Sequence, residues 1–418
     1  MKPILRRTFL LLILSQTFPL SAFSRNDTIP LNRAFGMKIG GFVRNDFFYD
    51  SRQTVEGVEG LLIFYPKPPD LDNTGKDINA APAANFLSLT SRLNSRFYGP
   101  DVLGAKASAF LEFDFTGTSN TNGVRLRQAY LDFAWDKTSL LVGRTWHPLS
   151  NSMPATLSIN QGAPFWAFNR SDQVRFNYRP GKWLLSATAS YQSDYASLGP
   201  IGKSSSYLRN AVWPEWTLNI EHHSPTTLIG IAGNTKTIKP RPFTLSPEDN
   251  TTRYATDETL TTFTGQLYFQ YQSSKWKIKA QSIYNQNMTE SLLIGGYAVS
   301  ATDPVTGRET YTPTQYMNYW LNVVYGTKWQ AVFFAGYLNS LGTLDKVSGP
   351  WYARDPGIKY MYRLSPQLTY NVNNWHFGIE LDYTAVSYGT IKANTRGEIV
   401  NNKNIGNLRT LLAVSFDL

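Results

Sequence analysis

Apolar and polar side chains alternate along the end of the chain, residues 407–418. Leu408, Leu412 and Val414 share one face of an extended strand, and Arg409 lies on the other face among mostly polar neighbours. A strand with such an apolar face invites aggregation if it is left as a bare edge. We therefore predict that this strand has partners on both sides, and that pairing with the first strand of the same chain closes a barrel.

The same alternation recurs along the whole chain, whereas no long segment has a convincing helical period. It predicts sixteen strands: 37–50, 85–98, 103–116, 124–136, 139–146, 172–179, 183–194, 213–222, 227–238, 260–272, 275–288, 314–326, 329–340, 356–371, 375–390 and 405–418. Even-numbered strands are followed by tight turns. Odd-numbered strands are followed by long, polar loops at 51–84, 147–171, 195–212, 239–259, 289–313, 341–355 and 391–404, with the short connection 117–123 as the exception.

This segregation of connections by length predicts the fold class. Short turns at one rim and long loops at the other are the layout of a transmembrane barrel, with turns on the periplasmic side and loops outside. A soluble sandwich has no reason to separate its loops in this way. We predict an all-β, transmembrane antiparallel up-and-down β-barrel of about sixteen strands.

Aromatic side chains repeat at one spacing. Trp183, Trp276, Trp329 and Trp375 each open a predicted strand just after a short turn, and a tyrosine follows on the same face at Tyr191, Tyr284, Tyr337 and Tyr383. The stretch between them rises by roughly 20 Å on a tilted strand, close to the ~25 Å apolar band between the aromatic girdles of a barrel. Aromatic residues also favour soluble strands, but four repeats of one spacing favour girdles.

Composition excludes other classes. The chain has 418 residues and 42% hydrophobic content, and after the N-terminus no stretch approaches the ~20 apolar residues of a membrane helix. Cysteine is absent, which excludes disulfides, thiolate metal sites and cysteine nucleophiles. The net charge of +10 would suit a nucleic-acid binder, but beyond the N-terminus there is no Lys/Arg run and no recognisable binding motif. We expect no nucleic-acid partner.

The N-terminus is typical of an export signal. Lys2, Arg6 and Arg7 form a positive region, residues 9–14 an apolar core, and residues 22–24 a small-x-small cleavage site. We therefore expect a signal peptide over residues 1–24 and a barrel domain over 25–418. The expected location is a bacterial outer membrane, in contact with lipid and lipopolysaccharide.

If the apolar face of each strand meets lipid, the side chains of the opposite face point into the barrel. Its charges do not suit a dry core, because an unpaired buried charge is costly, and about sixteen strands leave an aqueous lumen. The predicted lumen and constriction residues are Arg44, Arg92, Arg96, Glu112, Asp114, Arg170, Arg175 and Arg179. Other inward charges include Lys106, Lys277, Lys279, Glu380, Asp382 and Arg409. Inward cations outnumber anions, which favours anionic solutes. The alternative is that these charges only pair across strands.

The loop at 147–171 differs from the other loops. It reads HPLSNSMPATLSINQGAPFWAFNRS, with many apolar residues and almost no charge before Arg170. We hypothesise that it folds into the lumen and narrows the channel, with Arg170, Arg175 and Arg179 at or just below the narrowest point. The alternative is that it caps the rim or contacts a neighbouring subunit.

Four segments resemble the DcaP-like family of outer-membrane porins: VRLRQAYLDF at 124–133, LVGRTWHPLS at 141–150, NQGAP at 160–164 and QVRFNYR at 173–179. The resemblance is most specific over about 124–179, and elsewhere it rests on the strand pattern. It implies a trimeric barrel with an inward-folded third loop and passive uptake of small, often anionic solutes. The homotrimer is implied by the resemblance alone.

These observations predict an outer-membrane porin that passes small hydrophilic, anionic solutes and needs no cofactor or metal. A substrate-selective uptake channel is the main alternative, and a barrel enzyme or an adhesin is more distant. Barrel enzymes need a histidine site, and the chain has His147, His222, His223 and His376. His376 is expected to face inward with Glu380 and Asp382 on its face, but the sequence places no serine beside it. His222 and His223 fall at a predicted short turn, and His147 lies in the loop before a proline. No nucleotide, zinc or calcium motif is present, and a TonB-dependent transporter would need a plug and about twenty-two strands.

Overall fold

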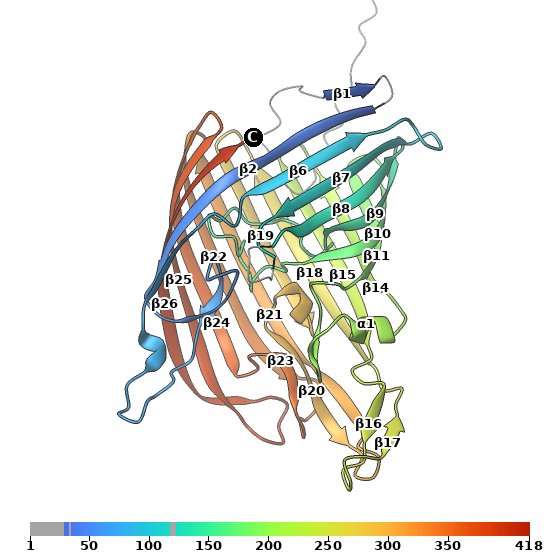
Figure 1. Cartoon of the computed structure of the whole chain (residues 1–418), viewed down its shortest axis with the longest axis vertical. Helices are drawn as coiled ribbons and strands as arrows, with labels where there is room; N and C mark the ends of the chain where they lie inside the picture. Colours follow the sequence, from blue (N-terminus) through green and yellow to red (C-terminus); the bar gives the residue numbers. More distant parts are fainter. Residues whose placement is uncertain (1–28, 33–34, 118–122) are drawn as a thin grey trace, which may run out of the picture.

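The computed structural model describes residues 29–32, 35–117 and 123–418, and the predicted signal peptide lies outside them. Sixteen antiparallel strands close into an up-and-down barrel, which confirms the predicted fold class (Figure 1). None of the helices in the described ranges is long and apolar enough to cross a membrane.

Each barrel strand pairs with the next one along the chain. The barrel strands are β2 (Phe35–Asp50), β6 (Arg92–Tyr98), β7 (Lys106–Asp114), β8 (Arg125–Ala134), β9 (Thr138–Trp146), β10 (Arg170–Tyr178), β11 (Trp183–Tyr191), β14 (Glu215–His223), β15 (Thr227–Ile238), β18 (Leu260–Gln272), β19 (Trp276–Gln286), β21 (Glu309–Gly326), β22 (Trp329–Thr343), β24 (Ile358–Val372), β25 (Trp375–Ile391) and β26 (Ile399–Asp417). The shorter elements are β1 (Ile29–Asn32), β3 (Thr54–Gly57), β4 (Leu62–Pro66), η1 (Ile78–Ala80), β5 (Ala83–Leu87), β12 (Leu198–Gly199), β13 (Gly202–Lys203), α1 (Ser206–Asn210), β16 (Phe243–Leu245), β17 (Arg253–Ala255), η2 (Thr289–Ser291), β20 (Gly295–Thr302) and β23 (Trp351–Arg354).

The last strand closes the barrel as its alternation predicted. β26 pairs with β2 from Phe42 opposite Asp417 to Asp50 opposite Arg409, and its other edge pairs with β25. All sixteen predicted strands are present. The predicted strand 85–98 is divided into β5 and β6, which pair with different halves of β2.

The apolar and aromatic side chains of the strands face outward, as the alternation predicted. Trp183, Trp276, Trp329 and Trp375 are between 43% and 58% exposed on the outer face of the barrel. The tyrosines that follow at Tyr191, Tyr337 and Tyr383 are between 41% and 43% exposed, while Tyr284 donates a hydrogen bond to Gln315 Oε1 at 2.7 Å. The outer face is therefore apolar with aromatic residues toward both ends of its strands, as a lipid-facing surface requires.

Two sectors of the barrel differ in height. Strands β6–β11, called here the short wall, have seven to ten residues each. Strands β21, β22, β24, β25 and β26, called here the tall wall, have 15 to 19 residues each. Figure 1 shows the short turns and the C-terminus at one end of the barrel, with β16 and β17 extending beyond the other end.

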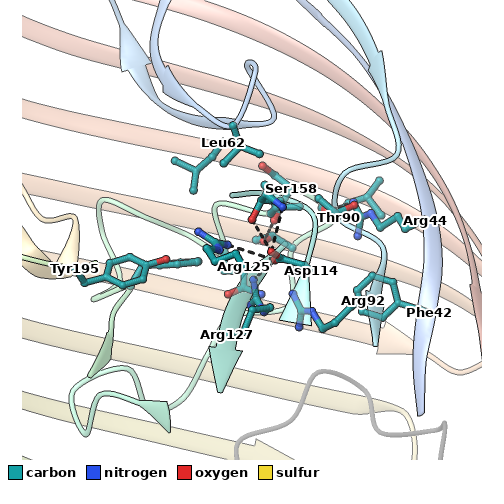
Figure 2. Close-up of a pocket in the computed structure, with 17 residues that line it drawn as sticks. Phe42, Arg44, Leu62, Thr90, Arg92, Asp114, Arg125, Arg127, Ser158 and Tyr195 are labelled. Atoms are coloured by element: carbon teal, nitrogen blue, oxygen red, sulfur yellow. Dashed lines mark hydrogen bonds and ion pairs between the residues drawn. The ribbon is translucent and has the colours of Figure 1, made fainter. Parts of the chain in front are cut away.

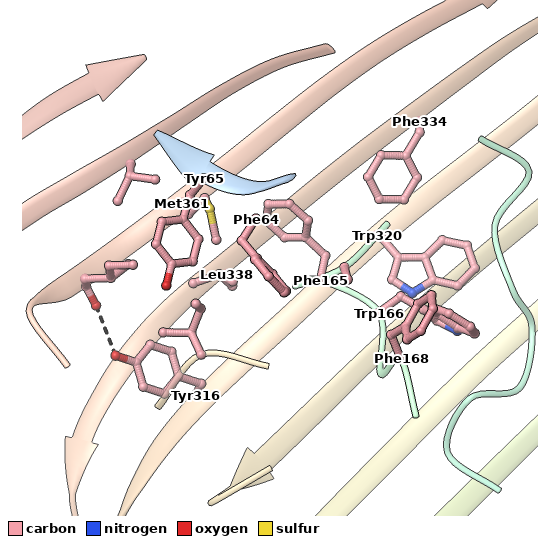
Figure 3. Packing of buried hydrophobic residues seen from close by; sticks show 14 of the residues in the cluster. Phe64, Tyr65, Phe165, Trp166, Phe168, Tyr316, Trp320, Phe334, Leu338 and Met361 are labelled. Atoms are coloured by element: carbon pink, nitrogen blue, oxygen red, sulfur yellow. Dashed lines mark hydrogen bonds between the residues drawn. The ribbon is translucent and has the colours of Figure 1, made fainter. Parts of the chain in front are cut away.

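The largest buried hydrophobic cluster lies inside the barrel. Phe165 and Trp166, from the connection between β9 and β10, pack with Tyr65 of β4 against Trp320 of β21 and Phe334 of β22 (Figure 3). Aromatic side chains of this size each contribute about 1.5–3 kcal/mol when fully buried. Two loop segments, residues 147–169 and the β3–β4 hairpin at 54–66, therefore place apolar side chains inside the barrel. These side chains pack against the inward side chains of the tall wall.

Candidate functional site

A cavity of about 50 Å³ lies inside the barrel between strands β2 and β6–β8 on one side and the two loop segments on the other (Figure 2). Its lining residues are Phe42, Arg44, Val58, Leu62, Thr90, Arg92, Asp114, Thr116, Arg125, Arg127, Thr156, Leu157, Ser158, Ile159, Gln161, Phe168 and Tyr195. Of these described side chains, four are arginines and one is an acid. The strands supply all five charges, whereas the loop segments supply uncharged side chains.

Three of the arginines share two carboxylates. Arg127 donates to Asp114 Oδ2 at 2.6 Å and to Glu112 Oε1 at 2.9 Å. Arg125 reaches Asp114 at 3.3 Å, and Arg92 reaches Glu112 at 3.6 Å. Charge-assisted hydrogen bonds of this kind are strong in a low-dielectric setting. Among the described side chains of this cluster, cations outnumber anions, so the surface that faces the cavity stays net positive.

A β-bulge assembles this cluster. The register of β7 and β8 shifts so that Glu112 lies opposite Gln128 while Phe113 lies opposite Leu126, and Arg127 is the extra residue between them. A bulge places two successive side chains on one face. Arg127 is accordingly buried beside Glu112, and Gln128 donates to the same carboxylate at 3.2 Å.

Arg44 connects the strands to the loop segment 147–169. Its Nη2 atom donates to Asp46 Oδ1 and to the Leu157 carbonyl, each at 2.6 Å. The Leu157 amide donates in turn to Glu380 Oε2 of β25 at 2.7 Å. Backbone groups of Leu157 are therefore held from two different strands, which fixes this part of the segment beside the cavity.

Inward polar side chains hold the rest of the segment through its carbonyl groups. The contacts are Gln266 to Leu149 at 2.8 Å, Lys279 to Met153 at 2.8 Å, Asn322 to Ala155 at 3.1 Å, Arg363 to Ala163 at 2.8 Å and Asn318 to Pro164 at 2.9 Å. Each donor comes from a barrel strand, so the conformation of the segment depends on the barrel itself. This network satisfies backbone groups that would otherwise be buried without partners.

The predicted site residues divide into two sets. Arg44, Arg92 and Asp114 line the cavity, and Glu112 lies directly behind it as the partner of Arg92. The other four, Arg96, Arg170, Arg175 and Arg179, are not among the lining residues.

The four arginines outside the lining have separate surroundings. Arg170 is 1% exposed, stacks on Trp146 at 4.9 Å and donates to the Tyr195 hydroxyl at 2.8 Å. Arg96 donates to the Tyr130 hydroxyl at 2.9 Å, Arg175 donates to the Trp146 carbonyl at 2.8 Å, and Arg179 is exposed just beyond the end of β10.

Two lining arginines, Arg125 and Arg127, were not in the predicted set. Both lie in the VRLRQAYLDF segment, but strict alternation leaves the direction of Arg127 ambiguous because the bulge interrupts it. The pair of arginines two residues apart was the available signal. Assigning the direction of Arg127 requires the pairing of β7 with β8, which the sequence does not give.

Two further expectations need correction. The first loop, expected to be polar, contains the hairpin β3–β4, whose run Leu61–Tyr65 is buried inside the barrel. That apolar run was the missed signal. Glu380, Asp382 and Arg409 were expected to face a water-filled lumen, but they are 1%, 1% and 0% exposed because the loop segments cover them.

The histidines have local partners. The His376 ring lies 2.8 Å from Asn371 Oδ1 and 2.9 Å from Asp417 Oδ2, while Glu380 binds the Leu157 amide instead. His147 lies 3.3 Å from Glu215. Within the described ranges there is no group of three His, Asp or Glu residues arranged to hold a metal ion.

Neither a protein-family model nor a curated protein matches this sequence. Among solved structures, it is similar to the outer membrane channel DcaP of Acinetobacter baumannii, with 17% identity, 93% of this chain and 99% of that chain covered, and a TM-score of 0.66. OmpT of Vibrio cholerae matches at 11% identity over 93% of this chain and 100% of that chain, with a TM-score of 0.56. The anion-selective porin from Comamonas acidovorans matches at 8% identity over 92% and 100%, with a TM-score of 0.54. The chain therefore has the fold of outer-membrane channels, which confirms the resemblance to DcaP at the level of the fold.

Proposed function

We propose that this chain is an outer-membrane porin whose water-filled channel passes small hydrophilic, anionic solutes by passive diffusion. One observation carries the proposal: the cavity inside the barrel is lined by Arg44, Arg92, Arg125 and Arg127 with Asp114 as the single lining acid among the described side chains. A cationic surface in a narrow passage raises the local concentration of anions and repels cations. The similar fold of a porin described as anion-selective is consistent with this assignment.

The segment 147–171 narrows the channel in this proposal. Its support is the set of hydrogen bonds from strand side chains to the carbonyl groups of Leu149, Met153, Ala155, Ala163 and Pro164. A segment held in this way occupies cross-section inside the barrel and leaves the passage beside the arginines. The constriction then lies between residues 156–161 and strands β2 and β6–β8.

The location and the partners follow from the same proposal. We place the protein in a bacterial outer membrane after removal of the signal peptide, surrounded by lipid and lipopolysaccharide. We also propose a homotrimer, since one solved structure of the similar OmpT is described as a trimer form. The outer face of the short wall suits contact between copies, because it presents the small side chains Ala107, Ala109 and Ala129 beside Leu131.

Reconstitution of the purified protein in a planar bilayer tests the channel directly. Discrete conductance steps are expected, and under a potassium chloride gradient the reversal potential should have the sign of chloride permeation. Cation selectivity would contradict the assignment of the arginine-lined cavity as the passage. A protein that inserts and stays silent would instead favour a barrel enzyme or an adhesin.

A substrate-selective uptake channel is the second candidate. The cavity combines arginines with the apolar side chains of Val58, Leu62 and Phe168, a lining that suits one solute class better than bulk ions. Conductance that saturates with a single class of organic anion would favour this candidate over a general pore.

A further inference from the structure

The hairpin at 54–66 occupies the side of the cavity that faces away from the arginine-bearing strands. β3 and β4 pair from Thr54 opposite Pro66 to Gly57 opposite Leu62. The turn between them has positive φ angles at Val58, Glu59 and Gly60, of 56°, 53° and 84°. Val58 and Leu62 line the cavity, so the end of this hairpin lies at the place that the proposed function assigns to the passage.

A fully buried arginine of β26 holds the end of the hairpin. Arg409 is 0% exposed and donates to the Gly60 carbonyl at 2.7 Å and to the Leu61 carbonyl at 3.1 Å. Its Nε atom donates to Asp50 Oδ1 at 3.0 Å, and the guanidinium stacks on Phe48 at 4.3 Å. Burying such a charge is costly unless it is paired and fully hydrogen-bonded. The carbonyl groups of the hairpin complete that pairing, so the hairpin and Arg409 stabilise each other.

A second buried arginine, on β24, joins the hairpin to the other loop segment. Arg363 is 1% exposed and donates to the Phe64 carbonyl at 2.9 Å and to the Ala163 carbonyl at 2.8 Å. Asp382 lies 3.2 Å from its Nε atom. One guanidinium therefore fixes the separation between the hairpin and the segment 147–169.

Further contacts hold the hairpin along its length. The Tyr388 hydroxyl donates to the Pro66 carbonyl at 2.7 Å, and the Tyr65 hydroxyl binds Asp355. Leu61 packs against Phe48 of the barrel interior. A loop that only passed over the rim would not need contacts at both ends and in the middle.

We propose that the β3–β4 hairpin is a second lip of the constriction, and that Arg363 and Arg409 are positioning residues that set its distance from the arginine-bearing strands. This inference rests on the proposed channel function. In it, the size of the side chains at positions 58 and 62 limits which solutes pass, while the charge that attracts them comes from the opposite side. The passage then has two walls with separate tasks, size selection and charge selection.

Thiol modification in the bilayer tests this proposal cleanly, because the chain has no native cysteine. In a Val58→Cys channel, an added sulfonate-bearing methanethiosulfonate reagent should lower the single-channel conductance by about half, since it adds bulk and negative charge at the passage. The matched control is Leu71→Cys, which lies on the same loop outside the hairpin, where the native side chain is 64% exposed. The reagent should leave the conductance of this control unchanged, as it should leave that of the cysteine-free protein.

The positioning role is tested in the same background. Adding Arg409→Gln to Val58→Cys should raise the conductance before modification and speed the reaction of the introduced thiol severalfold, because the hairpin loses two carbonyl contacts. Arg409→Lys should restore part of the slow rate. If the glutamine variant fails to fold, the modification of Val58→Cys alone still decides the proposal.

The outcomes separate this inference from the proposed function. If the cysteine-free protein forms no channels, the proposed function itself is wrong. If that protein conducts, and the reagent changes the conductance of the Val58→Cys channel no more than that of the Leu71→Cys channel, the hairpin is not a lip of the passage and the inference is overturned.

Discussion

Inward arginines occur in two regions of this barrel, and they do different things. On β6 and β8, Arg92 and Arg127 are 9% and 4% exposed, line the cavity and share the carboxylate of Glu112. On β24 and β26, Arg363 and Arg409 are 1% and 0% exposed and donate to carbonyl groups of the loop segments. Residue type and strand parity are the same in the two regions, so neither property decides the function.

The role of an inward arginine depends on whether the loop segments pack directly over it. The tall wall provides the inward surface on which the apolar residues of both segments pack. Its arginines are enclosed there with Asp50 and Asp382 as partners, so they contribute hydrogen bonds to the fold and do not line the cavity. Between the segments and strands β2 and β6–β8 the cavity remains, and the arginines of these strands line it. In the proposed function, this net positive surface is the one that acts on solutes.

Deleting residues 150–168 should have the largest effect on conductance. The deletion removes most of the segment that packs between the two regions, so the single-channel conductance should rise severalfold as the passage widens. Shortening the exposed turn at 248–252 is the control, since none of its residues lines the cavity and β16 and β17 extend beyond one end of the barrel (Figure 1). This change should leave the conductance as it is. Unchanged conductance in the first variant would show that the segment does not narrow the passage.

The comparison also explains how much the sequence could predict. Alternation along each strand fixes which face meets lipid, so the barrel, its closure by β26 and the inward direction of Arg44 and Arg92 were predictable. Arg127 was not, because its direction depends on a bulge that only the pairing of β7 with β8 defines. The burial of Arg409 could not be predicted either. It depends on the β3–β4 hairpin, whose position is set by contacts between residues far apart in the sequence.

Removing Arg409, one of the two enclosed arginines of the tall wall, should lower stability without changing ion selectivity. Arg409→Gln leaves Asp50 buried without its partner, an effect of about 3–5 kcal/mol for a buried ion pair. The unfolding temperature, measured as the temperature at which the folded barrel no longer migrates differently from the unfolded chain on a gel, should fall clearly. The reversal potential of channels that still form should keep its sign and nearly its size. A loss of anion preference in this variant would contradict the division of the two regions.

Neutralising an arginine that lines the cavity should change ion selectivity and leave stability nearly unchanged. Arg125→Gln removes a contact of 3.3 Å to Asp114 from an arginine whose side chain is 24% exposed. Asp114 keeps Arg127 as a partner at 2.6 Å, so the stability cost should be smaller than that of Arg409→Gln. The reversal potential should move toward zero because the passage loses one of its four lining cations. Arg179→Gln is the matched control: it also removes an arginine, but at an exposed position beyond β10. An equal shift in both variants would mean that overall charge, not the lining of the cavity, sets selectivity.

Raising the salt concentration should have the smallest effect of these changes. It should lower ion selectivity, which depends on one region, more than thermal stability, which depends on the other. Mobile ions screen charges over about 10 Å at 0.1 M but about 3 Å at 1 M. If the proposed function is right, the anion preference of the unaltered channel should therefore weaken at 1 M, because it comes from the arginines of β2, β6 and β8 that line the cavity. Thermal stability should change little over the same range, since Arg363 and Arg409 are enclosed and their ion pairs with Asp382 and Asp50 are poorly screened. Both quantities should be measured on one preparation, so that the two regions are compared in the same protein. A stability loss that follows the loss of selectivity would mean that water and ions reach Arg363 and Arg409 as freely as they reach the arginines that line the cavity.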